Sequence, residues 1–253
     1  GWESAALIAK AGDIPFGGLY SAMIAPIKFE EITDFANAGD YVGAALAQDT
    51  TLVLELPGNI QFTPYFELEA PAGKKLTFYT DTYTDKQDMP NFKDTYVTAE
   101  GAQCYENYPW RSGSKLIIEA EAGVTFTRLG YRVSGFNGEW AGAFSSSDAG
   151  LDQLWQESLN TLAICMRDTY MDCPERERGP YMGDASNQID AVLYSYDQAG
   201  LDMTKKAILA CVAWTRTDGA IPSRAPSVKP QEIPNQSLIF MTSVYHLSLI
   251  HIS

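Results

Sequence analysis

The chain has 253 residues, of which 45% are hydrophobic, and a formal net charge of −14 from 32 acidic and 18 basic side chains. This composition predicts a globular protein with a sizeable core, and the acidic balance argues against nucleic acid or a membrane surface as a partner. The sequence has no apolar run of the roughly 18 residues that a membrane-spanning helix needs, and its start at Gly1-Trp2 shows no signal-peptide pattern.

The first part of the chain has the alternating pattern of β-strands. Strands are predicted at Thr51–Leu56, Ile60–Leu68, Lys75–Thr80, Lys115–Glu119 and Val124–Val133, with turns at Pro57–Asn59, Ala70–Gly73 and Gly123. The segment Asp81–Trp110 lacks a clean period and is predicted to form long loops. Short strands at this spacing predict an antiparallel β-sandwich over residues 1–143.

Helical spacing replaces this pattern near residue 145. Ser145–Asp148 offers N-cap side chains, and apolar residues follow at Leu151, Leu154, Trp155, Leu159, Leu162 and Met166. Further helices are predicted at Ala185–Gln198, ended by Gly200, at Asp202–Arg216, and from Asn235 or Ser237 with Leu238, Met241 and Tyr245 facing inward. Strands followed by helices predict a second domain over residues 144–253. Four helices cannot close a barrel of helical hairpins, so we expect this domain to be truncated, and the native origin of Leu247–Ser253 stays open.

The loop between the first two predicted helices, Asp168–Ala185, concentrates the charged residues. It holds five carboxylates, and its Pro and Gly residues prevent a continuous helix. Glycoside hydrolysis needs one carboxylic acid that stays protonated and a second that stays ionised, and crowding of Asp172, Glu177 and Asp184 would raise the pKa of at least one of them. A solvated loop of salt bridges explains the same charges equally well, so chemistry alone leaves both interpretations open.

A longer pattern in this loop favours the catalytic interpretation. The run Asp172-Cys-Pro-Glu-Arg-Glu-Arg178, followed by Gly183-Asp184, resembles the signature of the bacterial α-L-rhamnosidases of glycoside hydrolase family 78. The similarity extends over residues 45–245. It implies an antiparallel β-sandwich followed by the first helices of an (α/α)6 barrel, and inverting hydrolysis of terminal α-L-rhamnosyl groups from glycans or glycosides.

The resemblance also implies roles by position. It makes Glu177 the general acid, and it makes Asp172 and Asp184 the carboxylates that hold rhamnose hydroxyls; Tyr181, Arg176 and Trp214 are further substrate-binding candidates. The family places its general base downstream of this chain, so we expect the isolated 253 residues to be inactive. No cofactor or metal is implied, the expected partner is a rhamnose-containing glycan or glycoside, and a bacterial periplasmic or cytoplasmic location stays open.

One departure from the family pattern keeps two alternatives open. The family usually has Leu-Gly-Trp-Thr before the final Gly-Asp, whereas this chain has Gly179-Pro-Tyr-Met182, so that Tyr181 replaces the Trp. A tyrosine ring still stacks on a sugar, but with less area and an added hydroxyl. The alternatives are a glycosidase of the same fold that acts on another sugar, and a non-catalytic glycan-binding protein.

Overall fold

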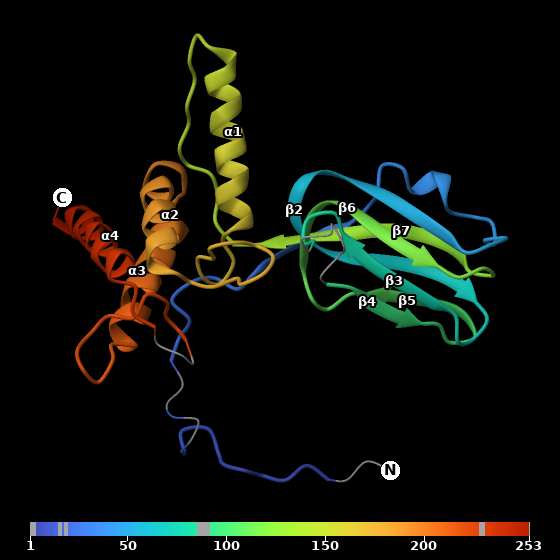
Figure 1. Cartoon of the computed structure of the whole chain (residues 1–253), viewed down its shortest axis with the longest axis horizontal. Coiled ribbons are helices and arrows are strands. Elements are labelled where there is room, and N and C mark those ends of the chain that lie inside the picture. The colour runs from blue at the N-terminus through green and yellow to red at the C-terminus, as the bar shows by residue number, and fades with distance from the viewer. Residues whose placement is uncertain (1–3, 15–16, 18–19, 85–91, 228–230, 253) are drawn as a thin grey trace.

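The computed structural model describes residues 4–14, 17, 20–84, 92–227 and 231–252. Within these residues the chain forms seven β-strands followed by four α-helices, and Figure 1 shows the strands and the helices as two separate groups. The strands are β1 (Lys28–Asp34), β2 (Thr50–Ala70), β3 (Lys75–Thr80), β4 (Asp94–Val97), β5 (Gly101–Glu106), β6 (Arg111–Ala120) and β7 (Thr125–Gly135). The helices are α1 (Ala149–Ile164), α2 (Met182–Ser195), α3 (Gln198–Ala213) and α4 (Pro234–Ile252).

The seven strands form one hydrogen-bonded sheet, and its antiparallel pairing is as predicted. Its order is β1-β7-β2-β6-β3-β4, and β5 pairs with β2 outside this path. The turns at Gly73 and Gly123 connect β2 to β3 and β6 to β7, strands consecutive in the chain but not adjacent in the sheet, and both glycines have a positive φ that other residues rarely adopt. Side chains of strands that are not hydrogen-bonded to each other meet in the core. Phe66 of β2, for example, packs edge to face on Phe78 of β3, with ring centroids 6.1 Å apart.

The predicted turn at Pro57–Asn59 is wrong, because β2 runs through it. The first part of β2 pairs with β6, the last part pairs with β7 and β5, and the register against β6 shifts between Glu55 and Ile60. A bulge of this kind lets a strand bend without ending, so Pro57 and Gly58 mark a change of partner and not a reversal of the chain. β2 thereby becomes the strand that links the two halves of the sheet.

The predicted long loop at Asp81–Trp110 is also wrong in part, because it contains β4 and β5. Both strands are short and lie at the margin of the sheet, where β4 pairs with β3 and β5 pairs with the end of β2. Tyr96 and Tyr105 pack against each other and against the core, with their ring centroids 4.7 Å apart. Aromatic packing between short edge strands leaves no clear period-two signal in the sequence.

The four predicted helices are present, with different bounds. Asp148 caps α1 by accepting a hydrogen bond from the Gly150 amide at 2.8 Å, as expected. Gly200 does not end a helix but lies in the first turn of α3, which Asp197 caps. A Cβ at Gly200 would lie 2.5 Å from the Cβ of Tyr196, so the glycine allows α3 to start directly against the end of α2.

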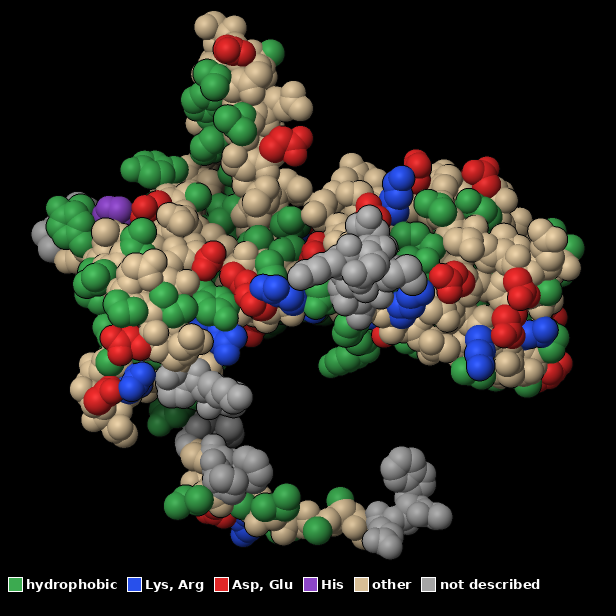
Figure 2. All heavy atoms as spheres, viewed as in Figure 1, with side chains coloured by type: hydrophobic (Ala, Val, Ile, Leu, Met, Phe, Trp, Pro, Cys, Tyr) green, Lys and Arg blue, Asp and Glu red, His purple; other side chains and the backbone are tan. Residues whose placement is uncertain are grey.

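The helices share a second core, but large parts of their apolar faces are exposed. Met182 and Ile189 of α2, Met203 of α3 and Phe240 of α4 are buried together. In contrast, Leu154 of α1 is 60% exposed. The expected inward orientation of Leu238, Met241 and Tyr245 on α4 is wrong, since all three are exposed, and Figure 2 shows hydrophobic side chains on the surface of the helical part. None of the helices among the described residues has the length and apolar character to cross a membrane.

Candidate active site

The charged loop begins at a fixed point on the sheet. Gln61 of β2 is only 4% exposed, and its side-chain amide donates to the carbonyl oxygens of Ile164 at 2.8 Å and Met166 at 3.1 Å. These carbonyls belong to the end of α1, where they have no partner within the helix. Arg167 completes the contact by donating from Nη1 to Gln61 Oε1 at 2.8 Å. A buried polar side chain of the sheet therefore sets where the loop starts.

The loop is closed by a reciprocal pair of hydrogen bonds. The amide of Asp172 donates to the carbonyl oxygen of Gly179 at 2.9 Å, and the amide of Gly179 donates to Asp172 Oδ1 at 2.7 Å. Arg178, just before the closure, has a φ of 48°. Residues 172–179 are thus a compact turn that presents the side chains between its two ends.

Glu177 projects from this turn with two charged neighbours. Interaction with the Asp172 carboxylate is the largest influence on its pKa, which is raised above its usual value; desolvation adds to this effect. Arg176 acts in the opposite direction, donating from Nη2 to Glu177 Oε1 at 2.7 Å. The side chain of Glu177 is 34% exposed, so it is open to an incoming ligand. This is the environment that a carboxylic acid needs if it is to donate a proton.

Asp184 reaches the same region from a different element. It lies in the first turn of α2, where the helix dipole favours a negative charge. Asp172 and Asp184 both raise the pKa of the buried Cys165 thiol, which desolvation in the first place brings to about 11. Both charges act on this thiol, and a shared role of Asp172 and Asp184 in holding a sugar stays a prediction.

Tyr181 is the N-cap residue of α2 and already has a partner. Arg224 lies over its ring at 5.1 Å and donates from Nη1 to the Tyr181 hydroxyl oxygen at 3.3 Å. The backbones of the two residues also form an isolated β-bridge. Tyr181 is half-buried, and one face of its ring is covered by a cation. Arg224 is a member of the site that the sequence did not indicate.

The structure does not join Trp214 to the loop. Trp214 is the C-cap residue of α3 and is 43% exposed, and among the described residues it has no hydrogen bond, ion pair or ring contact with residues 172–184. Asp218, in the loop after α3, forms an ion pair with Arg216 at 2.7 Å. The pKa of Asp218 is lowered, first by the hydrogen bond from the Ala220 amide, so contacts within its own loop favour the ionised carboxylate.

A cation–aromatic cluster ties the turn to the sheet and was not visible in the sequence. Trp110, just before β6, lies between two guanidinium groups, that of Arg178 at 3.6 Å and that of Arg167 at 4.6 Å from the ring centroid. Arg178 also donates from Nη2 to the Trp110 carbonyl oxygen at 3.3 Å. Since these contacts join residues far apart in the sequence, no local pattern predicts them.

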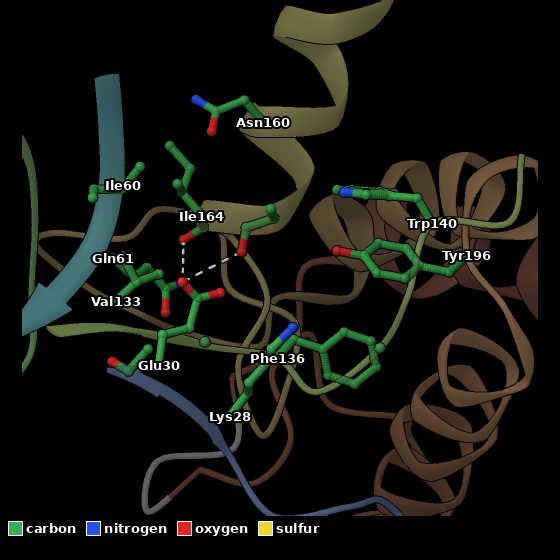
Figure 3. Close-up of a pocket in the computed structure, with 14 residues that line it drawn as sticks. Lys28, Glu30, Ile60, Gln61, Val133, Phe136, Trp140, Asn160, Ile164 and Tyr196 are labelled. Atoms are coloured by element: carbon green, nitrogen blue, oxygen red, sulfur yellow. Dashed lines mark hydrogen bonds between the residues drawn. The ribbon is translucent and has the colours of Figure 1, made fainter. Parts of the chain in front are cut away.

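A pocket of about 280 Å³ lies between the sheet and the last turns of α1. Figure 3 shows Gln61 reaching the end of α1 and the rings of Trp140 and Tyr196 lying against each other, with centroids 4.2 Å apart. None of the predicted site residues lines this pocket. Within the described part of the chain there is also no cluster of three or more His, Cys, Asp or Glu residues placed to hold a metal ion.

The comparisons with known proteins bear on the segment that carries this geometry. Residues 139–244 match the family described as the bacterial alpha-L-rhamnosidase 6 hairpin glycosidase domain, and this range includes the whole turn and all four helices except the end of α4. The resemblance that the motif suggested is thus confirmed. The chain is rhamnosidase-like.

Solved rhamnosidases share the fold of the rhamnosidase-like chain. The family 78 rhamnosidase of Bacillus sp. GL1 is 24% identical with a TM-score of 0.70, and the match covers 78% of this chain and 21% of that one. The Dictyoglumus thermophilum α-L-rhamnosidase is 19% identical with a TM-score of 0.73, covering 93% and 27%. The Klebsiella oxytoca rhamnosidase, solved with rhamnose bound, is 16% identical with a TM-score of 0.71, covering 90% and 52%. The chain therefore spans between about a fifth and a half of these relatives, and no curated protein matches its sequence.

Proposed function

We propose that this chain is part of an inverting glycoside hydrolase that removes terminal α-L-rhamnosyl groups from glycans or glycosides, with Glu177 as the general acid. The observation that carries the proposal is the pairing of Glu177 with Asp172 inside the segment that matches the rhamnosidase domain. A general acid must hold its proton near the working pH, and the neighbouring carboxylate shifts the Glu177 pKa in that direction.

The other carboxylates would bind the sugar. Asp172 keeps one oxygen in the hydrogen bond to the Gly179 amide, and carboxylate oxygens have further lone pairs that accept from sugar hydroxyls. Asp184 accepts such bonds from the start of α2, and Arg176 holds Glu177 in place. Rhamnose as the ligand is supported by the Klebsiella oxytoca and Streptomyces avermitilis rhamnosidases, which were solved with rhamnose.

The general base would come from outside these 253 residues. An inverting enzyme needs a second carboxylate about 6.5–9.5 Å from the acid to activate water. The relatives are two to five times as long as the part that this chain covers, which leaves room for that residue. We further propose that residues 1–143 are a β-sandwich domain and residues 144–253 the start of an (α/α)6 barrel, whose missing helices would cover the exposed faces of α1 and α4.

The test is hydrolysis of an aryl α-L-rhamnoside by the complete enzyme, with the anomeric form of the released sugar followed by NMR. Glu177→Gln keeps the size of the side chain but removes the proton, and we expect it to lower kcat by about 10²- to 10⁴-fold. Glu157→Gln, on the exposed surface of α1, is the matched control and should keep full activity. Equal activity of the Glu177 variant and the control, or no rhamnoside hydrolysis at all, contradicts the proposal.

A second candidate is a hydrolase of the same fold that acts on a different sugar. The observation in its favour is Tyr181, which replaces the tryptophan of the family and has Arg224 against its ring. This contact leaves less aromatic surface for a sugar to stack on than a free indole offers. A panel of aryl glycosides separates the two candidates, because cleavage of another glycoside with the rhamnoside untouched selects the second.

A further inference from the structure

A second pocket lies directly beside the turn that carries Glu177. It has a volume of about 340 Å³, within the usual range for sites that bind small molecules. Its walls come from the sheet and from the turn: Thr80, Tyr83, Phe92, Arg111, Ser112, Glu175, Arg176 and Arg178. We call it the arginine pocket. Three of its residues, Glu175, Arg176 and Arg178, lie within two positions of Glu177 in the sequence.

Three arginines and one carboxylate, Glu175, line the arginine pocket. Arg111 is only 4% exposed and forms an ion pair with Asp94. Arg178 donates to two backbone carbonyl oxygens, those of Pro174 and Trp110, and forms no ion pair with any described residue. The charge of Glu175, in the same pocket, favours the charged form of Arg178, but the two side chains form no ion pair, which a half-buried cation normally has.

The arginines also repel one another. The pKa of Arg178 is lowered to about 10, first by desolvation and then by the charge of Arg111, and the pKa of Arg167 is lowered to about 10 by desolvation and by Arg178. This concentration of cations lies in a chain whose net charge is −14. A bound anion would relieve both effects, because it offsets the repulsion and replaces the lost solvation.

Aromatic side chains in the same pocket suit a sugar ring. The guanidinium of Arg111 lies 3.8 Å from the ring centroid of Phe92, and Phe92 is itself 49% exposed, so part of its ring is open to a ligand. Tyr83 lines the pocket as well. A sugar packs its apolar C–H face on an aromatic ring and presents its substituents to polar groups. Aromatic rings beside guanidinium groups therefore match a sugar that carries a negative charge.

We propose that the arginine pocket is the leaving-group subsite and takes a hexuronate, a sugar whose carboxylate pairs with Arg111 and Arg178. The inference rests on the proposed function, since it names the residue to which the rhamnosyl group is attached. Its position follows from the turn: Glu175, Arg176 and Arg178 line the pocket beside the sheet, whereas Asp184 lies in the first turn of α2. A general acid lies between the sugar that is held and the sugar that leaves.

The test compares two disaccharides on the complete enzyme: a rhamnosyl hexuronate, and the rhamnosyl hexose with a hydroxymethyl group in place of the carboxylate. We expect the hexuronate to have a kcat/KM about 10- to 100-fold higher at low salt, the effect of one charge-assisted interaction. The preference should decrease as the ionic strength rises. Arg111→Gln should reduce the ratio of the two kcat/KM values toward one.

Arg128→Gln is the matched control. Arg128 lies on β7, pairs with Asp34 at the surface and does not line the pocket, so the same substitution there should leave the ratio unchanged. Equal hydrolysis of both disaccharides overturns the inference while the proposed function stands. If neither is cleaved, the proposed function fails, and calorimetry with D-glucuronate and D-glucose decides the inference: selective binding of glucuronate that Arg111→Gln abolishes supports the pocket, and no binding overturns it.

Discussion

Replacing Gln61 by leucine tests whether the sheet positions the turn that carries Glu177. The Gln61 side chain is buried, donates to the carbonyl oxygens of Ile164 and Met166, and accepts from Arg167. Leucine fills a similar volume but makes none of these bonds. The substitution leaves the end of α1 without its partner on the sheet and removes one acceptor from a buried guanidinium.

The magnitude follows from these contacts. Each of the two neutral hydrogen bonds is worth about 1 kcal/mol, and the bond from the Arg167 guanidinium about 1.5–3 kcal/mol. Arg167 keeps its second hydrogen bond, to the Ser134 hydroxyl at 3.1 Å, so its charge is not left entirely without partners. We therefore expect Gln61→Leu to lower the free energy of unfolding by about 3–5 kcal/mol.

The assay is urea denaturation of the chain, with Gln103→Leu as the control. Gln103 makes four side-chain hydrogen bonds, with Tyr96, Gly101 and twice with Ala99, but all lie within the short segment from β4 to β5, where water can replace them. We expect it to lose only about 1 kcal/mol. If Gln61→Leu loses no more than Gln103→Leu, the contact between sheet and helix does not have the strength inferred here.

Three further predictions concern the turn and its surroundings. Asp172→Asn removes the charge that raises the Glu177 pKa, so the alkaline limb of the kcat/KM profile of the complete enzyme should move to lower pH, because the acid then loses its proton earlier. If the Tyr181 ring stacks on the sugar, Tyr181→Phe should keep most of the rhamnoside kcat/KM, whereas Tyr181→Ala should lower it by up to about tenfold. Equal losses in the two variants would assign the role to the hydroxyl that is bonded to Arg224. Asp148→Ala removes the cap of α1 and should cost about 1 kcal/mol in urea denaturation, and no loss would show that the first turn of α1 is already frayed.

The sequence predicted most of what depends on local pattern. Alternation identified β2, β3, β6 and β7, Asp148 identified the start of α1, and the spacing of Asp172 and Glu177 identified two carboxylates that interact in the folded chain. These features succeed because a strand period, a cap or a short turn is determined by residues close in the chain.

The failures have a different physical origin. Pro57–Asn59 contains the residues of a turn, yet the strand continues because its two halves have different partners, which no local pattern records. Gly200 was interpreted as a helix stop, whereas its missing side chain makes room for Tyr196 of the preceding segment. The inward face predicted for α4 failed because amphipathic spacing shows which face is apolar but not whether a partner covers it.

The contacts between the sheet and the turn imply that, if Glu177 is the general acid as proposed, the sheet helps to position it. A continuous path runs from Gln61 of β2 to Arg167, from Arg167 to Trp110, and from Trp110 to Arg178, the residue next to Glu177. Each step is a hydrogen bond or a stacked cation, so a displacement of the sheet relative to α1 would move the acid. Catalysis depends on the acid being placed within a fraction of an ångström of the leaving oxygen. A helical domain expressed without the sheet should therefore lose activity even where it folds, because Arg178 would then have no indole to lie against.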